Sequence, residues 1–496
     1  MELEAAGCEQ TGQGRTIGHR AHIDLSKIAG TIHFIGVGGI GMSAIAQLLL
    51  ARMVPVSGSD REESGITRQL ELLGARICIG HQAANVDGAG AVIVSTAITE
   101  DNPELAAARA RSIPVWHRSQ LLAHLCEPFQ LIAISGTHGK TTTTGMVAQV
   151  LLDCALDPSV VIGGIFERIG SNARPGQGSF FVAEADESDR THAQVRSCLA
   201  VITNIEADHL ENYPGGMEQI RDNMAAFASN SELATILCQD DLGCRLIRPR
   251  LTGRVVTYGN KGSSPDADYT YESLPGLGMK VFEHGQAQGQ VTLAIPGEHN
   301  RLNALAAVAV CRELGLSLSE IGKALEAFKG VDRRFQVLGQ EDGITVVDDY
   351  AHHPTEVAAT LAAADQYRKD LGLSGSGRQA PRRIVAVFQP HQPGRLRDMW
   401  DEFLGAFELA DLVLVTDIYV ARGKAIDGIT SEKLAGSIRH KSVCYLPGKA
   451  LDLPPAIVSY LQPGDLVLTI GAGDITKVGS EILRLLKQRH SHGTAR

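Results

Sequence analysis

The sequence of 496 residues lacks several features that mark particular protein classes. It has no apolar run of about 18 residues, so no membrane-spanning helix is expected. The first 28 residues lack a basic start followed by an apolar core, and we therefore expect no secretory signal. The nine cysteines are scattered without a CxxC pair, which disfavours a cysteine zinc site and indicates reduced thiols in a cytoplasm.

Aromatic residues and net positive charge are also scarce. Aromatics make up 5% of the chain and the net charge is −10, so a basic surface for nucleic acid is not expected. A hydrophobic share of 44% is ordinary for a soluble globular protein, which we expect to be a monomer or homodimer. Glycine is abundant, with 53 residues, and many of them stand in short loops directly after apolar runs.

Short apolar runs alternate with longer amphipathic segments along most of the chain, which is typical of βαβ units and parallel sheets. The pattern restarts at Thr31, Leu131 and Ile344, so we predict an α/β chain of three domains. The predicted parts are a flexible tail (1–28), a Rossmann-like domain (29–127), a P-loop ATPase-like domain (128–335) and a second Rossmann-like domain (336–496). We also expect a flexible loop at 373–381 and a disordered tail at 490–496.

The string SGTHGKTTTT follows the apolar run Leu131–Ile134 directly. A glycine turn between strand and helix exposes backbone N–H groups at a helix N-terminus, which attracts anions. A lysine adds positive charge, and a threonine hydroxyl suits a magnesium ion. The loop is shorter than the common GxxxxGK[ST] pattern, and a tight turn with a solvated lysine is the alternative. We predict that its residues bind nucleotide phosphates: Gly136, Thr137, His138, Gly139, Lys140, Thr141 and Thr142.

Acidic residues follow the next two apolar runs and offer metal ligands. FFVAEADESD places Glu184 at the end of a predicted strand, and ITNIEADHL places Asp208 and His209 after another. We predict a magnesium site from Thr141, Glu184 and His209, although imidazole is an unusual magnesium ligand. A solvated acidic turn and a structural histidine are the alternatives.

An earlier glycine loop raises a different possibility. Its glycines, Gly36, Gly38, Gly39 and Gly41, followed by Asp60, would by themselves suggest an NAD or FAD site and hence an oxidoreductase. Such a loop physically implies only that a diphosphate lies on a helix N-terminus, and a packing turn is the plainer alternative.

The combined motifs resemble those of the Mur ligases of bacterial cell-wall synthesis and their folylpolyglutamate synthetase relatives. The resemblance covers nearly the whole chain, through these strings: GTHGKTT, EADESD, NIEADH, GEHNRLNALAA, RRFQ, DDYAHHP and GAGDI. It implies ATP and Mg²⁺ as cofactors and an amide bond formed to a UDP-muramic acid through an acyl phosphate.

Two strings imply a particular substrate pair within this family. HFIGVGGIGMSAIA and the doubled histidine of DYAHHP favour UDP-N-acetylmuramate and L-alanine as substrates, with tripeptide addition in recycling as the alternative. A non-catalytic nucleotide-binding regulator with the ligase fold is a further alternative, which the full set of motifs disfavours.

The resemblance also assigns roles to residues outside the two loops. The implied catalytic residues are Lys140, Glu184, His209 and Arg334. The implied further ATP contacts are Asn300, Asn303, Arg334, Asp349 and His352. The implied amino-acid contacts are Tyr350, His391 and Arg395, and the implied UDP-sugar contacts are the first loop with Asp60, Ser95 and Thr96. Gln392 and Arg422 depart from the family pattern, which puts the amino-acid end of the site in question.

Overall fold

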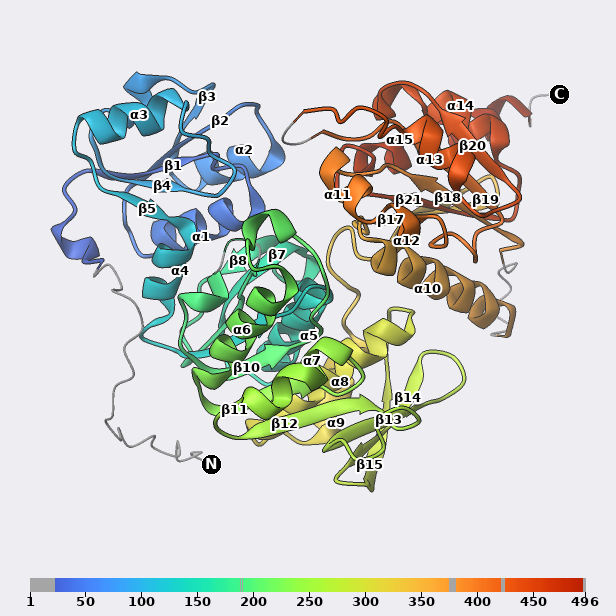
Figure 1. The fold of residues 1–496 in the computed structure, drawn as a ribbon, viewed down its shortest axis with the longest axis horizontal. Coiled ribbons are helices and arrows are strands. Elements are labelled where there is room, and N and C mark those ends of the chain that lie inside the picture. The colour runs from blue at the N-terminus through green and yellow to red at the C-terminus, as the bar shows by residue number, and fades with distance from the viewer. Residues whose placement is uncertain (1–22, 188, 190, 374–380, 421–423, 494–496) are drawn as a thin grey trace.

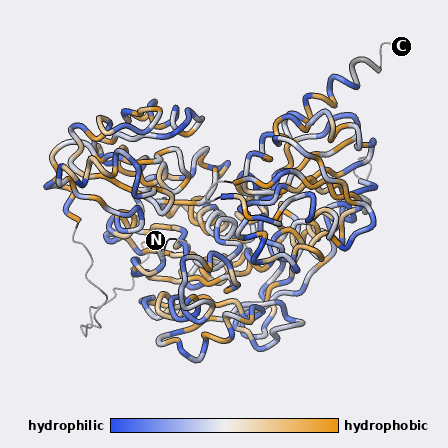
Figure 2. The backbone as a smooth tube through the Cα atoms, turned by 45° about the horizontal axis from the view of Figure 1, so that its top comes forward, coloured by the Kyte–Doolittle hydropathy of each residue, from blue (hydrophilic) through white to orange (hydrophobic). Residues whose placement is uncertain are grey.

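The computed structural model describes residues 23–187, 189, 191–373, 381–420 and 424–493. The described residues form three α/β bodies, which confirms the predicted fold class. In Figure 1 the first body lies at the upper left, the third at the upper right and the middle one below them. Figure 2 shows hydrophobic segments running through the interior of these bodies. The sheets occupy residues 31–117, 130–292 and 336–470, while the domain limits between them stay predictions.

The first sheet is parallel, with the strand order β3-β2-β1-β4-β5. Its strands are β1 (Thr31–Ile35), β2 (Val56–Asp60), β3 (Arg76–Ile79), β4 (Ala89–Val94) and β5 (Val115–His117). Its helices are η1 (Leu25–Lys27), α1 (Ile40–Ala51), α2 (Gly65–Leu72), η2 (Ala83–Val86), α3 (Pro103–Ala110) and α4 (Arg118–Cys126). The order reverses at β1, and ligands of such sheets bind outside the carboxyl end of the strands at this switch point.

The middle sheet has the order β15-β14-β13-β12-β11-β10-β6-β9-β7-β8, with antiparallel pairs only toward its edges in the described residues. Its strands are β6 (Gln130–Ser135), β7 (Ser159–Phe166), β8 (Ser171–Arg174), β9 (Phe180–Glu184), β10 (Ser197–Ile202), β11 (Ser231–Cys238), β12 (Val255–Asn260), β13 (Tyr269–Ser273), β14 (Gly278–Glu283) and β15 (Gln286–Thr292). Its α-helices are α5 (Lys140–Asp153), α6 (Gly216–Ser229), α7 (Leu242–Ile247), α8 (Glu298–Glu313) and α9 (Leu318–Glu326). The short helices are η3 (Glu167–Ile169), η4 (Thr191–Ala193), η5 (Leu210–Asn212) and η6 (Arg248–Arg250). Strand β6 lies between β10 and β9, which makes it the second switch point.

The third sheet has the order β16-β17-β21-β18-β19-β20, and only β16 among the described strands runs antiparallel. Its strands are β16 (Gln336–Glu341), β17 (Ile344–Asp349), β18 (Arg383–Phe388), β19 (Leu412–Thr416), β20 (Val443–Leu446) and β21 (Asp465–Ile470). Its helices are α10 (Pro354–Leu373), α11 (Pro393–Asp398), α12 (Trp400–Phe403), α13 (Ser431–Ser437), η7 (Ala450–Asp452), α14 (Pro454–Tyr460) and α15 (Thr476–Gly493). Strands β17, β19 and β21 are buried along their whole length, as parallel strands with helices on both faces must be.

The first two bodies share one hydrophobic core, whereas the third has cores of its own. Helix α1 packs against β7 and β8. At this seam Gln47 donates from Nε2 to Asn172 Oδ1 at 2.8 Å and accepts from Ser171 Oγ at 2.6 Å. The side chain of Asn172 is fully buried, so these bonds hold the first body to the second in water-free contact.

Two sequence expectations about the ends of the chain need correction. Helix α15 extends through His490–Gly493, so the predicted disordered tail is wrong for these residues. Ile23 is buried and Leu25–Lys27 form η1, so described structure reaches into the predicted flexible tail.

Most of the predicted 373–381 loop lies outside the described residues. None of the described helices combines the length and apolarity needed to cross a membrane.

Candidate active site

The loop between β6 and α5 depends on two glycines. Gly136 has a φ of 127° and Gly139 a φ of 81°, in the region that favours glycine. A Cβ atom at Gly136 would lie 2.1 Å from Thr203 Oγ1, and one at Gly139 would lie 2.5 Å from Asn303 Oδ1. Substitution at either position would therefore displace the loop from the N-terminus of α5, where backbone N–H groups attract anions.

Side chains that follow β10 hold this loop from the other side. Asn204 accepts from the His138 N–H at 2.8 Å and donates from Nδ2 to the His138 carbonyl at 3.0 Å. Thr203 Oγ1 donates to the same carbonyl at 2.6 Å. The loop is thus shaped before any ligand arrives, which lowers the entropic cost of binding.

Lys140 lies inside the loop and pairs with an acid. Its Nζ donates to the Gly136 carbonyl at 2.5 Å, to the Thr137 carbonyl at 3.1 Å and to Glu187 Oε2 at 2.7 Å. Burial lowers the pKa of Lys140, but the carboxylates of Glu187 and Asp186 outweigh burial and raise it above its ordinary value. The ammonium group is therefore charged and fixed beside the phosphate cradle.

Thr141 and Glu184 lie side by side next to the loop. A Cβ atom at Gly163 would lie 3.0 Å from Thr141 Oγ1 and 2.7 Å and 2.9 Å from the two carboxylate oxygens of Glu184, so both side chains face the same point. Glu184 ends β9 and accepts from the Gly163 N–H at 2.5 Å. Burial raises its pKa, so a cation nearby favours its charged form. Magnesium prefers oxygen ligands, and this hydroxyl and carboxylate fit such an ion.

Asp208 and His209 follow β10, the neighbour of β6 on its other side. His209 Nε2 lies 3.6 Å from Asp208 Oδ2. Arg395 of α11 donates from Nη2 to Asp208 Oδ1 at 3.0 Å, and both side chains are buried. Burial raises the pKa of Asp208, but His209 and Arg395 outweigh burial and lower it far below its ordinary value. The metal role of His209 stays a prediction.

The two asparagines of α8 form a buried pair behind the phosphate loop. Asn303 donates from Nδ2 to Asn300 Oδ1 at 3.3 Å and accepts from Thr143 Oγ1 at 3.3 Å. Asn300 donates to the Pro296 carbonyl at 2.6 Å. Asn303 thus supports α5 directly, while the ATP contact of Asn300 stays a prediction.

The connection into the third sheet carries charged residues. Asp349 accepts from the Phe335 N–H at 2.8 Å, from the Ala351 N–H at 2.8 Å and from Thr360 Oγ1 at 3.0 Å. Burial raises its pKa to about 6. The guanidinium carbon of Arg334 lies 5.1 Å from the ring centre of Tyr350. In this arrangement Asp349 orders the connection, and Arg334 extends over an aromatic ring.

Aromatic and imidazole rings line up from Tyr350 toward β19. The ring centres of Tyr350 and His352 are 5.2 Å apart, those of His352 and His391 5.7 Å, and those of His391 and Tyr419 5.8 Å. Arg395 Nη1 lies 3.1 Å from His391 Nδ1. Burial lowers the pKa of His352 to about 4, so its imidazole is neutral. The structure thus brings together the three residues predicted to contact the amino-acid substrate, Tyr350, His391 and Arg395.

The first glycine loop is held by an acid. Asp60 Oδ2 accepts from the Gly38 N–H at 2.8 Å, and a Cβ atom at Gly38 would lie 2.8 Å from the same oxygen. Gly36 has a φ of 79°, and Gly39 caps α1. Ser95 and Thr96 directly follow β4, which pairs with β1, so they share the edge of the sheet with this loop. Asp60 therefore has a shaping role that exists without any ligand.

Arg118 connects the first glycine loop to the acidic segment that follows β9. A Cβ atom at Gly41 would lie 2.0 Å from its Nη1. Its Nη2 lies 2.6 Å from Asp189 Oδ2 and 3.2 Å from Asp186 Oδ2, both on the acidic segment that follows β9. The guanidinium group therefore spans from the N-terminus of α1 to the neighbourhood of Lys140.

Three family models match consecutive parts of the chain. They are described as Mur ligase family, catalytic domain (31–130), Mur ligase middle domain (134–311) and Mur ligase, glutamate ligase domain (333–473). The chain belongs to the Mur ligase family. A relative named UDP-N-acetylmuramate–L-alanine ligase from Geobacter sulfurreducens is 45% identical over 92% of this chain and 98% of its own. One of the same name from Myxococcus xanthus is 42% identical over 93% and 96%.

Solved structures of Mur ligases also resemble this chain. The UDP-N-acetylmuramate-alanine ligase from Thermotoga maritima has a TM-score of 0.78 and 30% identity, covering 93% of this chain and all 100% of its own. A murein peptide ligase from Psychrobacter arcticus has a TM-score of 0.69 at 23% identity, covering 92% and 99%. The second likeness concerns the fold alone.

Within this Mur ligase, the structure gathers the predicted nucleotide residues around the end of β6 and the predicted amino-acid residues around α11. Gln392, one of the two departures from the family pattern, donates its backbone N–H to the Tyr419 carbonyl at 3.0 Å. Arg422, the other departure from the family pattern, lies outside the described residues. The individual binding roles stay predictions.

Sequence reasoning assigned no role to several residues that the structure places in the site. These are Arg118, Glu187, Asn204, Glu206, Glu356 and Tyr419. The motifs contain Glu187, Asn204 and Glu206, but the pattern does not say which acid faces Lys140. Arg118 stands in no motif, and only the packing of two domains brings it to the acidic segment.

Proposed function

We propose that this chain is an ATP-dependent ligase that joins L-alanine to the carboxylate of UDP-N-acetylmuramate in peptidoglycan synthesis in the cytoplasm. The observation that carries this proposal is the 45% identity, over 92% of the chain, to a relative named for that reaction. Two separate anion cradles, each at the switch point of its sheet, supply what a sugar nucleotide and ATP require.

Forming an amide from a carboxylate and an amine is uphill in water. In the proposed reaction the carboxylate of the muramic acid attacks the γ-phosphorus of ATP, and ADP leaves. The amine of alanine then attacks the acyl carbon, and the tetrahedral adduct expels inorganic phosphate. Phosphoryl transfer of this kind needs positioning and charge stabilisation rather than a protein nucleophile.

The chain's own residues supply those needs at the second loop. Lys140 is charged and fixed beside the cradle, where it stabilises negative charge on the transferred phosphoryl group. Thr141 and Glu184 would hold Mg²⁺, which neutralises phosphate charge when bound, and His209 is the proposed additional ligand. Asn300 and Asn303 are proposed to bind the nucleoside, and Arg334, Asp349 and His352 to complete the pocket upon closure.

The alanine end of the proposed site centres on Arg395. Its guanidinium group is bound to Asp208 in this state, beside His391 and close to the Tyr350–His352 rings. A guanidinium fork suits a carboxylate, so we propose that it binds the alanine carboxylate. Because Asp208 belongs to the middle domain and Arg395 to the third, the same contact couples amino-acid binding to domain closure.

A phosphate-release assay tests the proposal. ATP, UDP-N-acetylmuramate and L-alanine together should release phosphate, and omission of any one should stop it. Matched reactions with the tripeptide in place of L-alanine, or with NAD as the nucleotide, serve as controls. Release with the tripeptide but not with L-alanine would reject the proposed substrate, and reduction of NAD without ATP turnover would reject the ligase itself.

A further inference from the structure

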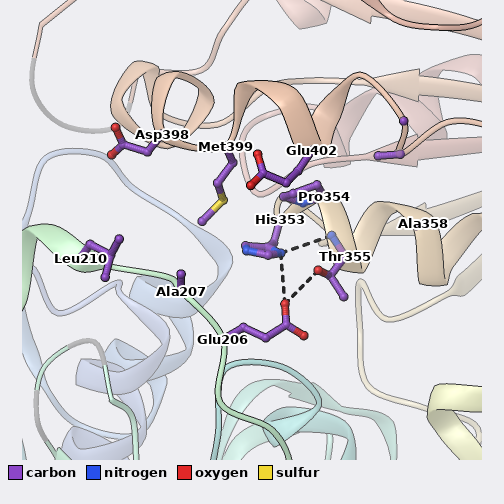
Figure 3. A pocket seen from close by; sticks show the side chains of 12 residues that line it. Glu206, Ala207, Leu210, His353, Pro354, Thr355, Ala358, Asp398, Met399 and Glu402 are labelled. Atoms are coloured by element: carbon purple, nitrogen blue, oxygen red, sulfur yellow. Dashed lines mark hydrogen bonds and ion pairs between the residues drawn. The ribbon is translucent and has the colours of Figure 1, made fainter. Parts of the chain in front are cut away.

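Two histidines from different domains meet beside the pocket of Figure 3. His138 belongs to the phosphate loop, and His353, labelled in Figure 3, stands directly before α10; their ring centres are 4.6 Å apart. Glu206, from the loop after β10, reaches toward both rings. Its Oε2 lies 3.6 Å from His138 Nε2 and 4.0 Å from His353 Nδ1. The three candidate ligand atoms all lie within 4.8 Å of one another.

The surrounding hydrogen bonds prepare these atoms as ligands. His138 Nδ1 lies 3.0 Å from Glu356 Oε1, so its N–H is donated there and Nε2 faces Glu206 and His353. An ion bound at Nε2 would replace the proton that the neighbouring carboxylates favour on this ring. That Nε2 atom is buried and has no hydrogen-bond partner among the described residues. A histidine that donates one ring N–H to a carboxylate and presents the other nitrogen is the usual arrangement of metal-binding histidines.

The other two candidate ligands are oriented by one residue. Thr355 donates from Oγ1 to Glu206 Oε2 at 2.9 Å, and its backbone N–H donates to His353 Nδ1 at 3.3 Å. The second bond uses the lone pair of Nδ1, so an ion bound at this nitrogen would take the place of the Thr355 N–H. Figure 3 shows these contacts converging at the edge of the pocket.

We propose that His138, Glu206 and His353 form a binding site for a divalent transition-metal ion, with Zn²⁺ as the best fit. Two imidazole nitrogens and one carboxylate oxygen are the ligand set of known three-residue zinc sites, which keep a further position open. Imidazole suits zinc, copper or nickel, whereas magnesium takes oxygen. The site therefore differs in chemistry from the oxygen pair of Thr141 and Glu184.

The pocket gives an ion access to this cluster. Glu206 and His353 line a cavity of about 600 Å³, and Asp398 and Glu402 line it as well. These carboxylates make the entrance attractive to cations. Because His138 and His353 belong to different domains, a bound ion ties the phosphate loop to the third domain. Bound Zn²⁺ would therefore hold the present arrangement of domains and inhibit turnover.

Zinc binding to the full-length, metal-free chain tests the proposal directly. Competition against a chromophoric chelator, in excess magnesium and without nucleotide, should reveal one tight site per chain. Glu206→Gln and His353→Gln should each weaken this site at least about tenfold, while His284→Gln, an exposed histidine 69% accessible, should leave it unchanged. No tight site in the unmodified chain, or a zinc affinity in both ligand variants equal to that of the unmodified chain, would overturn the proposal.

Two further measurements separate this zinc site from the magnesium pair and from a loss of folding. Glu184→Gln should retain the tight zinc site, and its loss there would assign the ion to the magnesium pair and reject the proposal. Circular dichroism and thermal melting confirm that Glu206→Gln and His353→Gln are folded, and the two variants lie on different domains. Since binding is measured without substrates, failure here leaves the phosphate-release test of the proposed ligase unaffected.

Discussion

The two glycine loops of this chain share their setting but differ in their surroundings. Gly36–Gly41 follows β1 and Gly136–Gly139 follows β6, and each strand lies where the order of its sheet reverses. Both loops lead into the N-terminus of a helix, so each provides a cradle for an anion. By backbone geometry alone, the two loops could serve the same kind of ligand.

The side chains around the loops separate their uses. The second loop carries its own cation, Lys140, and has the oxygens of Thr141 and Glu184 beside it. The first is held by the carboxylate of Asp60, and its cation, Arg118, comes from α4. Phosphoryl transfer needs a fixed cation and metal ligands at the phosphates. The surroundings of the second loop therefore suit phosphoryl transfer from ATP, whereas those of the first suit only the binding of a diphosphate.

Lys140→Ala should show the largest functional difference between the two loops. Loss of the fixed ammonium group should reduce phosphate release about 10³-fold, because charge stabilisation is lost in the transition state. Binding of UDP-N-acetylmuramate, measured by calorimetry, should be retained. Lys329→Ala, an exposed lysine with its side chain 72% accessible, is the control. Undiminished alanine-dependent phosphate release would contradict the role of the second loop.

Glu184→Gln should have the second-largest effect on activity. With one carboxylate removed from the predicted magnesium pair, the magnesium concentration for half-maximal activity should rise about 10–100-fold. Magnesium titration of phosphate release measures this change, and Glu167→Gln, an exposed acid 65% accessible, is the control. A titration that matches the unmodified enzyme would show that Glu184 holds no metal.

A reciprocal pair of glycine substitutions sharpens the comparison. Gly38→Ala crowds Asp60 and should weaken UDP-N-acetylmuramate about tenfold, while Gly139→Ala crowds Asn303 and should weaken ATP to a similar degree. Each variant should bind the other ligand normally. Gly65→Ala, where an added Cβ meets no atom within 4 Å, is the control. Equal loss of both ligands in one variant would show that the loops do not act separately.

Arg118→Ala should have the smallest effect. It removes the contact from the first loop to Asp189 and Asp186, an ion pair that is largely shielded from water. We expect about fivefold weaker UDP-N-acetylmuramate binding, because a cation beside the proposed diphosphate site at the N-terminus of α1 is lost. Calorimetry at two salt concentrations measures it, with Arg111→Ala, on the exposed pair to Asp87, as control. An unchanged affinity would leave Arg118 as a packing residue.

The sequence predicted the sheets well because parallel strands are buried on both faces. Strands β18, β19 and β21 are each a nearly continuous apolar run, so the alternation of strands and helices after Ile344 can be read from the sequence. The polar residues His490–Gly493 were expected to be disordered, yet they continue α15. Local composition does not show how far a helix continues once it has started.

The site was predictable where one motif supplies all its parts. The glycines, Lys140 and Thr141 stand together in the sequence, so their common loop follows from spacing. The meeting of His138 with His353, and of Arg118 with Asp189, joins residues from different domains. No periodicity or local pattern encodes how domains pack, so such contacts had to come from the structure.

A crystal structure with UDP-N-acetylmuramate and a non-hydrolysable ATP analogue bound together would show directly whether the two loops hold different nucleotides. We expect the diphosphate of the sugar nucleotide on Gly36–Gly41 and the phosphates of the ATP analogue on Gly136–Thr142. Either ligand bound elsewhere, or both bound at one loop, would contradict this division between the loops.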